Sequence, residues 1–206
     1  MSLRKDYVPT INNPKTAEAL AGMYNQPNHL ADAKNIISLI PSSAAKVLDA
    51  GCGTGRLATV LSSEKYFGVD LASHLLKKAE TNFPNHKFGL MAIKHLIFPD
   101  ENFDAVLSIN VLKHLHREEV TEAFDELVRV CKKGGTIIIR VPIIPETRDY
   151  SEYDAFLPKK IDYEDIAFHW SDIFALANRH NLTIVHPESF LTSKDPYTAP
   201  LTVFRK

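Results

Sequence analysis

Short apolar runs alternate along the chain with segments in which apolar residues recur every three to four positions. An apolar run bounded by turn residues predicts a buried strand, and a spacing near 3.6 residues predicts a helix that packs on one face. We expect helices at residues 16–23, 30–40, 55–62, 73–82, 118–131 and 171–181, and strands at 46–50, 66–69, 86–90, 103–109, 136–141, 182–186 and 201–204. Strands that alternate with helices in this order predict an α/β fold with a doubly wound, mostly parallel sheet of seven strands and helices on both faces.

The same pattern predicts a single domain over residues 1–206. We expect an N-terminal helical cap, a ligand-binding core, a lid, and a C-terminal part with a helix and strands, at residues 1–45, 46–141, 142–170 and 171–206. The lid follows from the length of the connection after the core, because connections this long in compact domains are often lids or binding loops. The chain has enough residues to bury a full core.

Three glycines at alternate positions, Gly51, Gly53 and Gly55, follow the strand expected at 46–50. Glycine permits tight turns and a close backbone approach to a ligand, because it has no Cβ. The helix expected next places free N–H groups and a positive dipole end at the carboxyl edge of this strand. Ligands bind at that edge in open α/β sheets, so the segment predicts a nucleotide-cofactor site.

Two families of nucleotide-binding proteins have motifs close to this turn. The dinucleotide fingerprint is Gly-x-Gly-x-x-Gly, and the place of its third glycine is taken by Arg56, which disfavours a nicotinamide-dependent oxidoreductase. The run Val-Leu-Asp-Ala-Gly-Cys-Gly-Thr-Gly at 47–55 resembles instead the first motif of class I S-adenosylmethionine-dependent methyltransferases. The similarity continues at residues 67–71, 98–104, 111–115 and 133–135, in the order of that family. The chain therefore resembles the small-molecule type of these enzymes, like methyltransferase domain 11, with their Rossmann-like fold.

The resemblance implies S-adenosylmethionine as the cofactor. Asp49 is expected to accept a hydrogen bond from its ammonium group or to order the glycine turn, and Asp70 to accept from both ribose hydroxyls or to cap the helix that follows. Asn110 either lines the methionine side or only makes a turn, and Cys52 is either a reactive thiol or a small residue that fits the turn. The expected cofactor-binding residues are Asp49, Gly51, Cys52, Gly53, Gly55, Asp70, Leu71, Met91, Ala92 and Asn110.

One departure from the family concerns the adenine. Related enzymes often place a carboxylate after the third strand, where this chain has Ala92 and, close by, Lys94. Apolar contact and backbone groups are then left to hold the adenine, and the affinity for the cofactor is expected to be weaker by about 1–3 kcal/mol.

Methyl transfer is expected to be an in-line displacement at the sulfonium carbon. The protein then mainly aligns the nucleophile at about 3–3.5 Å and excludes water. A general base is needed only for a protonated nucleophile, and the candidates are His114, His169 and Tyr24. A role in packing alone would also explain each of these residues. No catalytic residue is assigned, and a non-catalytic cofactor-binding regulator or scaffold is the alternative function.

Composition narrows the expected partners. The net charge of -1, and the absence of a Pro-Pro-aromatic motif after Asn110, predict a small-molecule acceptor and no nucleic acid. The chain has no run of about 18 apolar residues, so we expect no membrane span. It has no cluster of carboxylates around Asp104, so we expect no metal site. The 2 cysteines, Cys52 and Cys131, suit a reducing compartment, so we expect a cytoplasmic protein. The oligomeric state stays open.

Overall fold

The computed structural model describes residues 12–24, 26–144, 146, 166–187 and 199–206. Its helices are α2 (Pro14–Tyr24), α3 (Pro27–Ser38), α4 (Ser73–Asn82), α5 (Arg117–Val130) and α7 (Trp170–Arg179), with short 3-10 helices η1 (Arg56–Thr59) and η2 (Leu112–His114). The strands are β1 (Val47–Ala50), β2 (Tyr66–Asp70), β3 (Lys87–Leu90), β4 (Phe103–Ile109), β5 (Cys131–Arg140), β6 (Thr183–Pro187) and β7 (Leu201–Arg205).

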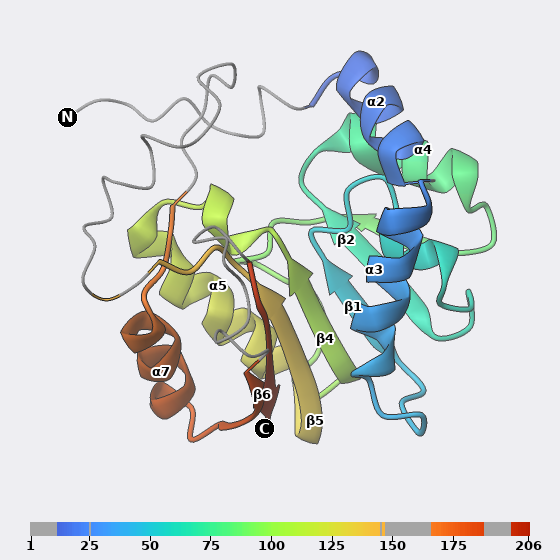
Figure 1. Ribbon diagram of the computed structural model, residues 1–206. Helices are drawn as coiled ribbons and strands as arrows, with labels where there is room; N and C mark the ends of the chain where they lie inside the picture. Colours follow the sequence, from blue (N-terminus) through green and yellow to red (C-terminus); the bar gives the residue numbers. More distant parts are fainter. Residues whose placement is uncertain (1–11, 25, 145, 147–165, 188–198) are drawn as a thin grey trace.

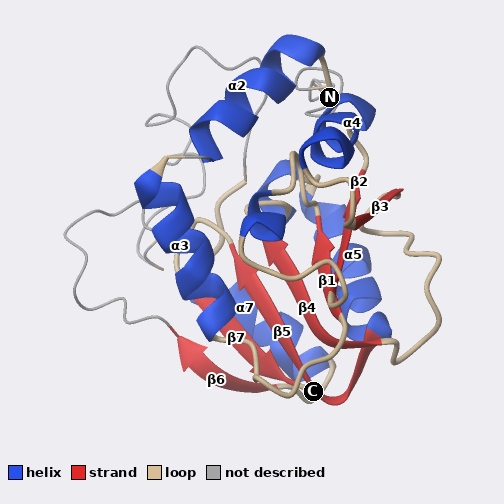
Figure 2. Ribbon diagram, turned by 90° about the vertical axis from the view of Figure 1, so that its right-hand side faces the viewer, coloured by secondary structure: helices blue, strands red, loops and turns tan. Residues whose placement is uncertain are grey.

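The strands form one 7-stranded sheet in the order β3-β2-β1-β4-β5-β7-β6, which runs through the middle of the molecule (Figure 2). Only β7 is antiparallel to its neighbours among these strands. The chain order reverses between β1 and β4, and ligands of doubly wound sheets bind at the carboxyl ends of the strands beside such a reversal. The expected α/β fold is confirmed.

Alternate residues of the strands face two separate hydrophobic clusters. Leu48 of β1 and Val106 of β4 pack with α5 and α7, whereas Val47 and Leu107 pack with α3 and the segment around η1. Figure 1 shows α5 and α7 on one side of the sheet and α3 on the other. This period of two residues along each strand explains why helices cover both faces.

The prediction of a helix over residues 55–62 is wrong in length. Only the single 3-10 turn of η1 forms there. Gly55 precedes it in a left-handed conformation, with φ of 84°, and the hydroxyl of Thr59 donates to the carbonyl oxygen of Arg56 at 2.7 Å. A threonine hydroxyl that bonds the preceding turn competes with regular helix formation.

Other helix ends also differ from the expected ones. The helix expected at 16–23 spans Pro14–Tyr24, and the helix expected at 30–40 spans Pro27–Ser38, since proline fits the first turn of a helix. The helix expected at 118–131 ends at Val130, and Cys131 already begins β5 instead of the strand starting at 136. The helix expected to be capped by Ser171 begins at Trp170, because His169 is its N-cap and donates its backbone N–H to the Asp172 carboxylate at 2.7 Å. A carboxylate at this position also favours the positive helix start.

Most of the segment expected to be a lid, residues 147–165, lies outside the described residues. Its two ends are described, and they are anchored: the backbone N–H of Ile144 donates to the carbonyl oxygen of Phe168 at 2.9 Å, and both side chains are buried. Within the described residues, no helix combines the length and the apolar character that crossing a bilayer requires.

Candidate functional site

The glycine turn after β1 has left-handed backbone at each of its three glycines. The φ angles are 90° at Gly51, 55° at Gly53 and 84° at Gly55. A Cβ at Gly51 would lie 2.2 Å from a methyl carbon of Val111, and one at Gly55 would lie 3.0 Å from the ring of Phe83. A Cβ at Gly53 would meet nothing within 4 Å. The turn is therefore crowded by protein at both ends and open in the middle.

Asp70, at the end of β2, holds this turn. One of its carboxylate oxygens accepts from the backbone N–H of Gly53 at 2.7 Å, and the other accepts from that of Ala72 at 2.8 Å. Burial raises the pKa of Asp70, and these backbone N–H groups oppose the shift. The helix α4 has Ala72 as its N-cap and no side-chain cap, so the structure shows Asp70 as a turn residue rather than a helix cap.

Asp49 lies beneath the turn, and only 3% of it is exposed. Its carboxylate accepts from the hydroxyl of Tyr66 at 2.8 Å. Burial raises the pKa of Asp49 to about 6, while the Tyr66 hydrogen bond and the charge of Arg56 act in the opposite direction. Asp49 is thus a buried carboxyl group with a single side-chain partner among the described residues, and burial favours its neutral form.

Cys52 is a buried residue of the turn. Its sulfur lies close enough to Gly68 that a Cβ there would be 2.9 Å away, and burial raises the pKa of the thiol well above its usual value. A buried thiol of this kind is unreactive. The structure favours the reading of Cys52 as a small residue that fits the turn.

The residues expected around the adenine lie beside Asp70. The backbone N–H of Met91 donates to the carbonyl oxygen of Asp70 at 3.1 Å, which places Met91 and Ala92 next to Leu71. Half of Leu71 is exposed (50%), which leaves its side chain accessible to a ligand. The nearby Lys94 forms an ion pair with Glu119, which raises the pKa of Lys94.

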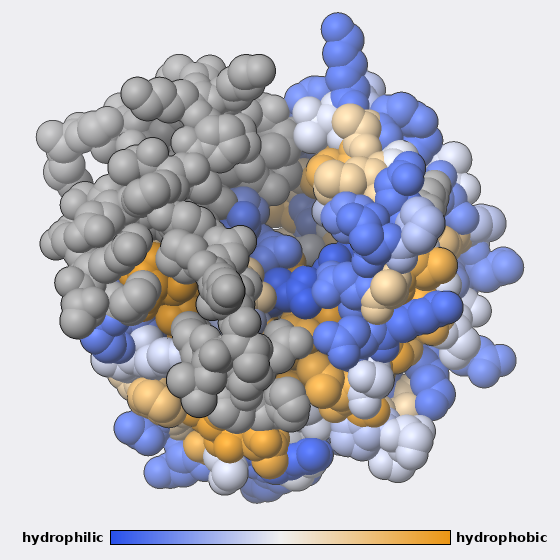
Figure 3. Space-filling model, in the orientation of Figure 1, coloured by the Kyte–Doolittle hydropathy of each residue, from blue (hydrophilic) through white to orange (hydrophobic). Residues whose placement is uncertain are grey.

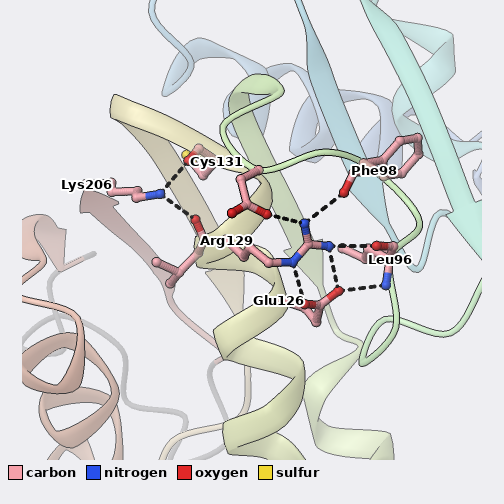
Figure 4. Close-up of polar contacts among 8 residues, drawn as sticks. Leu96, Phe98, Glu126, Arg129, Cys131 and Lys206 are labelled. Carbon is pink, nitrogen blue, oxygen red and sulfur yellow. Dashed lines mark hydrogen bonds and ion pairs between the residues drawn. The ribbon is translucent and has the colours of Figure 1, made fainter.

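Arg129, at the end of α5, fastens the loop that follows Met91 and Ala92. Its guanidinium donates to the carbonyl oxygens of Leu96 and Phe98 at 2.7 and 2.8 Å, and it also donates to the carboxylates of Glu126 and Asp100 (Figure 4). Glu126 in turn accepts from the backbone N–H of Leu96 at 2.8 Å. The sequence pattern did not single out Arg129, because nothing local marks an arginine whose partners lie in another loop.

Asn110, directly after β4, adopts a positive φ of 62°, which asparagine tolerates better than most residues. Its backbone N–H donates to the carbonyl oxygen of Arg140 at 2.9 Å, at the end of β5. Asn110 therefore lies where the carboxyl ends of two central strands meet. The positive φ of Asn110 fits the turn interpretation, and its contact with the cofactor stays a prediction.

The three candidate bases come from different elements. Tyr24 ends α2, and Arg56 stacks over its ring at 5.6 Å. Burial raises the pKa of Tyr24, the charge of Arg56 lowers it, and the charges of Asp49 and Asp70 raise it, so Tyr24 lies within reach of the glycine turn. His114 ends η2, and His169 caps α7 with its Nδ1 3.6 Å from a carboxylate oxygen of Glu146.

Asp32 of α3 joins two arginines at this edge of the sheet. Its carboxylate accepts from Arg56, next to the glycine turn, at 2.6 Å, and from two nitrogens of Arg140, at the end of β5, at 2.7 Å each. Sequence reasoning noted Arg56 only as the residue that replaces a fingerprint glycine, and it missed Asp32 and Arg140. A separate hollow of about 160 Å³, between Asp104 and Lys132, lies at the opposite edge.

Comparisons with known proteins agree with this geometry. Residues 48–139 match the family model described as a methyltransferase domain. The chain is 35% identical over 119 residues to the uncharacterized methyltransferase YodH of Bacillus subtilis, which covers 54% of this chain and 50% of that protein. It is also 35% identical over 100 residues to a tRNA (carboxymethyluridine(34)-5-O)-methyltransferase of Arabidopsis thaliana, covering 48% of this chain and 24% of that protein. The chain spans about half or less of the length of these relatives.

Solved structures share the fold over nearly the whole chain. Magnesium protoporphyrin IX methyltransferase from Synechocystis, with bound SAH, has a TM-score of 0.73 at 16% identity and covers 97% of both chains. At this identity the likeness concerns the fold alone.

The expectation of no nucleic-acid partner is wrong. Several relatives carry names of tRNA methyltransferases, including the Arabidopsis enzyme and the proteins named "Probable tRNA methyltransferase 9B" of mouse and human. The net charge of a whole chain averages over its surfaces, so a value near zero does not exclude a local contact with RNA. The Pro-Pro-aromatic motif is specific to enzymes that act on exocyclic amines of bases, and its absence excludes only that chemistry.

The family match begins in β1 and ends in β5, so it contains the glycine turn, Asp70, the loop after β3 and Asn110 in one continuous segment. The motifs and the sheet order agree with this match. From β1 to β5 the chain is therefore similar to the methyltransferase domain family.

Proposed function

We propose that this protein binds S-adenosylmethionine at the carboxyl edge of β1, β2 and β4 and methylates an acceptor held beside it. The observation that carries the proposal is the glycine turn, which is open at Gly53 and lies between the buried carboxyl group of Asp49 and the partly buried one of Asp70. Backbone that approaches a ligand closely, flanked by anions, suits a cofactor with a cationic methionine end and ribose hydroxyls.

The residues present fit this group. Asp49 would hold the ammonium group, Asp70 the ribose, and Leu71, Met91 and Ala92 the adenine. When bound, S-adenosylmethionine supplies a methyl group that its sulfonium already activates. The chain's own part is to bind, to orient the acceptor and to exclude water, and we propose that the helices α2 and α3 act as a cap for this purpose.

The adenine side supports a modest affinity. Position 92 is alanine, where related enzymes often have a carboxylate, and Lys94 is held in an ion pair by Glu119. We keep the expectation that the missing partner weakens binding by about 1–3 kcal/mol.

Asp70→Asn tests the cofactor site. S-adenosylhomocysteine should raise the unfolding temperature of the wild-type protein and NAD should not, because only a ligand of the folded state stabilises it. Asp70→Asn should lose most of this shift, since the amide cannot accept with both of its terminal atoms. Asp104→Asn is the matched control: Asp104 also accepts from two backbone N–H groups, of Ala45 and Lys46, but at the opposite edge of the sheet. Stabilisation by NAD alone, or an unchanged shift in Asp70→Asn, would contradict the assignment.

The pH dependence of binding tests Asp49. The pKa of Asp49 is about 6 in the free folded protein and 3.8 ordinarily. Between these two pH values the folded protein keeps the carboxyl proton of Asp49, whereas the unfolded chain has lost it. Without cofactor, Asp49 therefore makes the protein less stable as the pH rises from about 4 to about 6. A bound ammonium group favours the charged carboxylate, so S-adenosylhomocysteine should bind about tenfold more weakly at about pH 5 than at about pH 7.

Titration calorimetry at the two pH values measures this effect. The variant Asp49→Asn should bind weakly at both, without the pH dependence. An equally strong dependence in the variant would assign the titration to another group.

The acceptor is proposed to be a small molecule, with an RNA as the second candidate because of the relatives named for tRNA. Formation of S-adenosylhomocysteine with a panel of both kinds of acceptor distinguishes them. Binding without turnover on any acceptor would favour the non-catalytic alternative. Both cysteines are free thiols, which supports placing the protein in the reducing cytoplasm.

A further inference from the structure

We propose that Arg56 and Arg140 form a subsite for an oxyanion, a phosphate or carboxylate group, carried by the methyl acceptor. The proposal rests on the proposed function, because it takes the cofactor to lie at the glycine turn. The subsite would let the enzyme select acceptors by charge and orient them from the side of α3.

The two arginines lie beside the glycine turn and the carboxyl ends of the central strands. Arg56 directly follows Gly55 of the turn, and the backbone of Arg140 pairs with Asn110 at the end of β4. Asp32 connects their guanidinium groups from α3, so the cluster spans the distance between the turn and β5. Figure 3 shows strongly hydrophilic surface in the middle of this face of the molecule, in the region where Figure 1 has the carboxyl ends of β4 and β5.

The arginines keep most of their donors unused. A guanidinium group has five N–H donors. Among the described residues, Arg56 makes one hydrogen bond and Arg140 makes two, all to Asp32. The exposed fractions of their side chains are only 12% and 13%, and the Nε of Arg140 is buried with no described partner. A buried donor without an acceptor destabilises the folded protein. This indicates that a ligand supplies acceptors for the unused N–H donors of the two arginines.

Arg129 of the same protein is a structural arginine with which the use of donors in Arg56 and Arg140 can be compared. All of its nitrogens donate, to two carbonyl oxygens and two carboxylates, although its side chain is 30% exposed (Figure 4). Arg56 and Arg140 are more deeply buried and have fewer partners. Fastening α3 to the sheet therefore accounts for only part of their donor capacity.

The charges also leave room for an anion. Burial raises the pKa of Asp32, but hydrogen bonds and charge from Arg140, and then from Arg56, hold it below its ordinary value, so Asp32 is ionised. One carboxylate then faces two cations. Among the described residues, the charge of Arg56 also acts on Asp49, which the ammonium group of the bound cofactor would engage. Arginine pairs recognise phosphate and carboxylate groups through parallel N–H donors, which suits an oxyanion better than a neutral group.

Nuclear magnetic resonance of the arginine Nε–H groups tests the proposal on the full chain saturated with S-adenosylhomocysteine. Sodium phosphate and sodium acetate are titrated at constant ionic strength, and the signals of Arg56 and Arg140 are assigned from Arg56→Lys and Arg140→Lys. Both signals should shift to saturation with at least one of the ions. In Asp32→Asn the same ion should bind at least about tenfold more tightly, because the competing carboxylate is neutral. The control Arg205→Gln, in an exposed side chain at the end of β7, should bind as the wild type does.

Two further probes identify the source of a bound phosphate. Ribose 5-phosphate binding about as well as a 5′-phosphorylated RNA trinucleotide indicates a small acceptor, and markedly tighter binding of the trinucleotide indicates an RNA acceptor. The proposal is overturned if neither ion moves the two signals, or if they move only without S-adenosylhomocysteine, since the subsite would then belong to the cofactor. Failure of S-adenosylhomocysteine to stabilise the wild type refutes the proposed function separately, and the anion titration remains readable in that case.

Discussion

Gly51→Ala is expected to lower the free energy of unfolding by more than about 3 kcal/mol, whereas Gly53→Ala should lower it by only about 1 kcal/mol. Both glycines have positive φ, which costs any residue with a Cβ some strain. At Gly51 the new Cβ would also lie 2.2 Å from Val111, so the end of β1 and the segment after β4 would have to separate. At Gly53 the new Cβ would meet open space.

The two variants separate stability from binding. Urea unfolding measures the first effect, and calorimetry with S-adenosylhomocysteine the second. Gly53→Ala should fold and yet lose at least about tenfold in affinity, because its methyl group enters the space assigned to the cofactor. Wild-type affinity in a folded Gly53→Ala protein would show that the cofactor does not approach the turn there.

Arg129→Met should destabilise the protein by about 3 kcal/mol. Methionine retains the unbranched apolar stem of arginine, so the change mainly removes the guanidinium group. The carbonyl oxygens of Leu96 and Phe98 then lose their donor, and the half-buried carboxylate of Glu126 loses its counter-ion. The loop that carries Met91 and Ala92 would lose its attachment to α5.

Arg179→Met is the matched control, since Arg179 also pairs with a carboxylate, that of Asp125, but on the exposed side of α7. Its effect on stability should be far smaller, because solvent screens an exposed ion pair. Hydrogen exchange by mass spectrometry should show faster exchange at residues 91–98 in Arg129→Met alone, together with weaker binding of S-adenosylhomocysteine. Unchanged exchange there would mean that other contacts hold the loop.

Local pattern was sufficient for the order of most elements and for the place of the glycine turn. The bounds of β4 and α4 agree with the expected residues 103–109 and 73–82, because a buried run and an amphipathic period are properties of neighbouring positions. The three glycines predicted a tight turn at the end of β1, and each has positive φ. The same logic failed for η1, where the hydroxyl of Thr59 and the conformation of Gly55 shortened a helix whose apolar spacing was correct.

The sequence by itself determined the order of the elements, the mostly parallel sheet and the place of the glycine turn. Only the tertiary structure decided which side chains meet across it. Asp32 and Arg140 are 108 residues apart along the chain, and they bond only because α3 lies over the end of β5. Arg129 likewise finds its partners in a loop about 30 residues away, and Tyr66 meets Asp49 through the register of β1 and β2. Spacing along a chain encodes how each element is built, whereas such pairs depend on how the elements pack, and the proposed anion subsite is one of them.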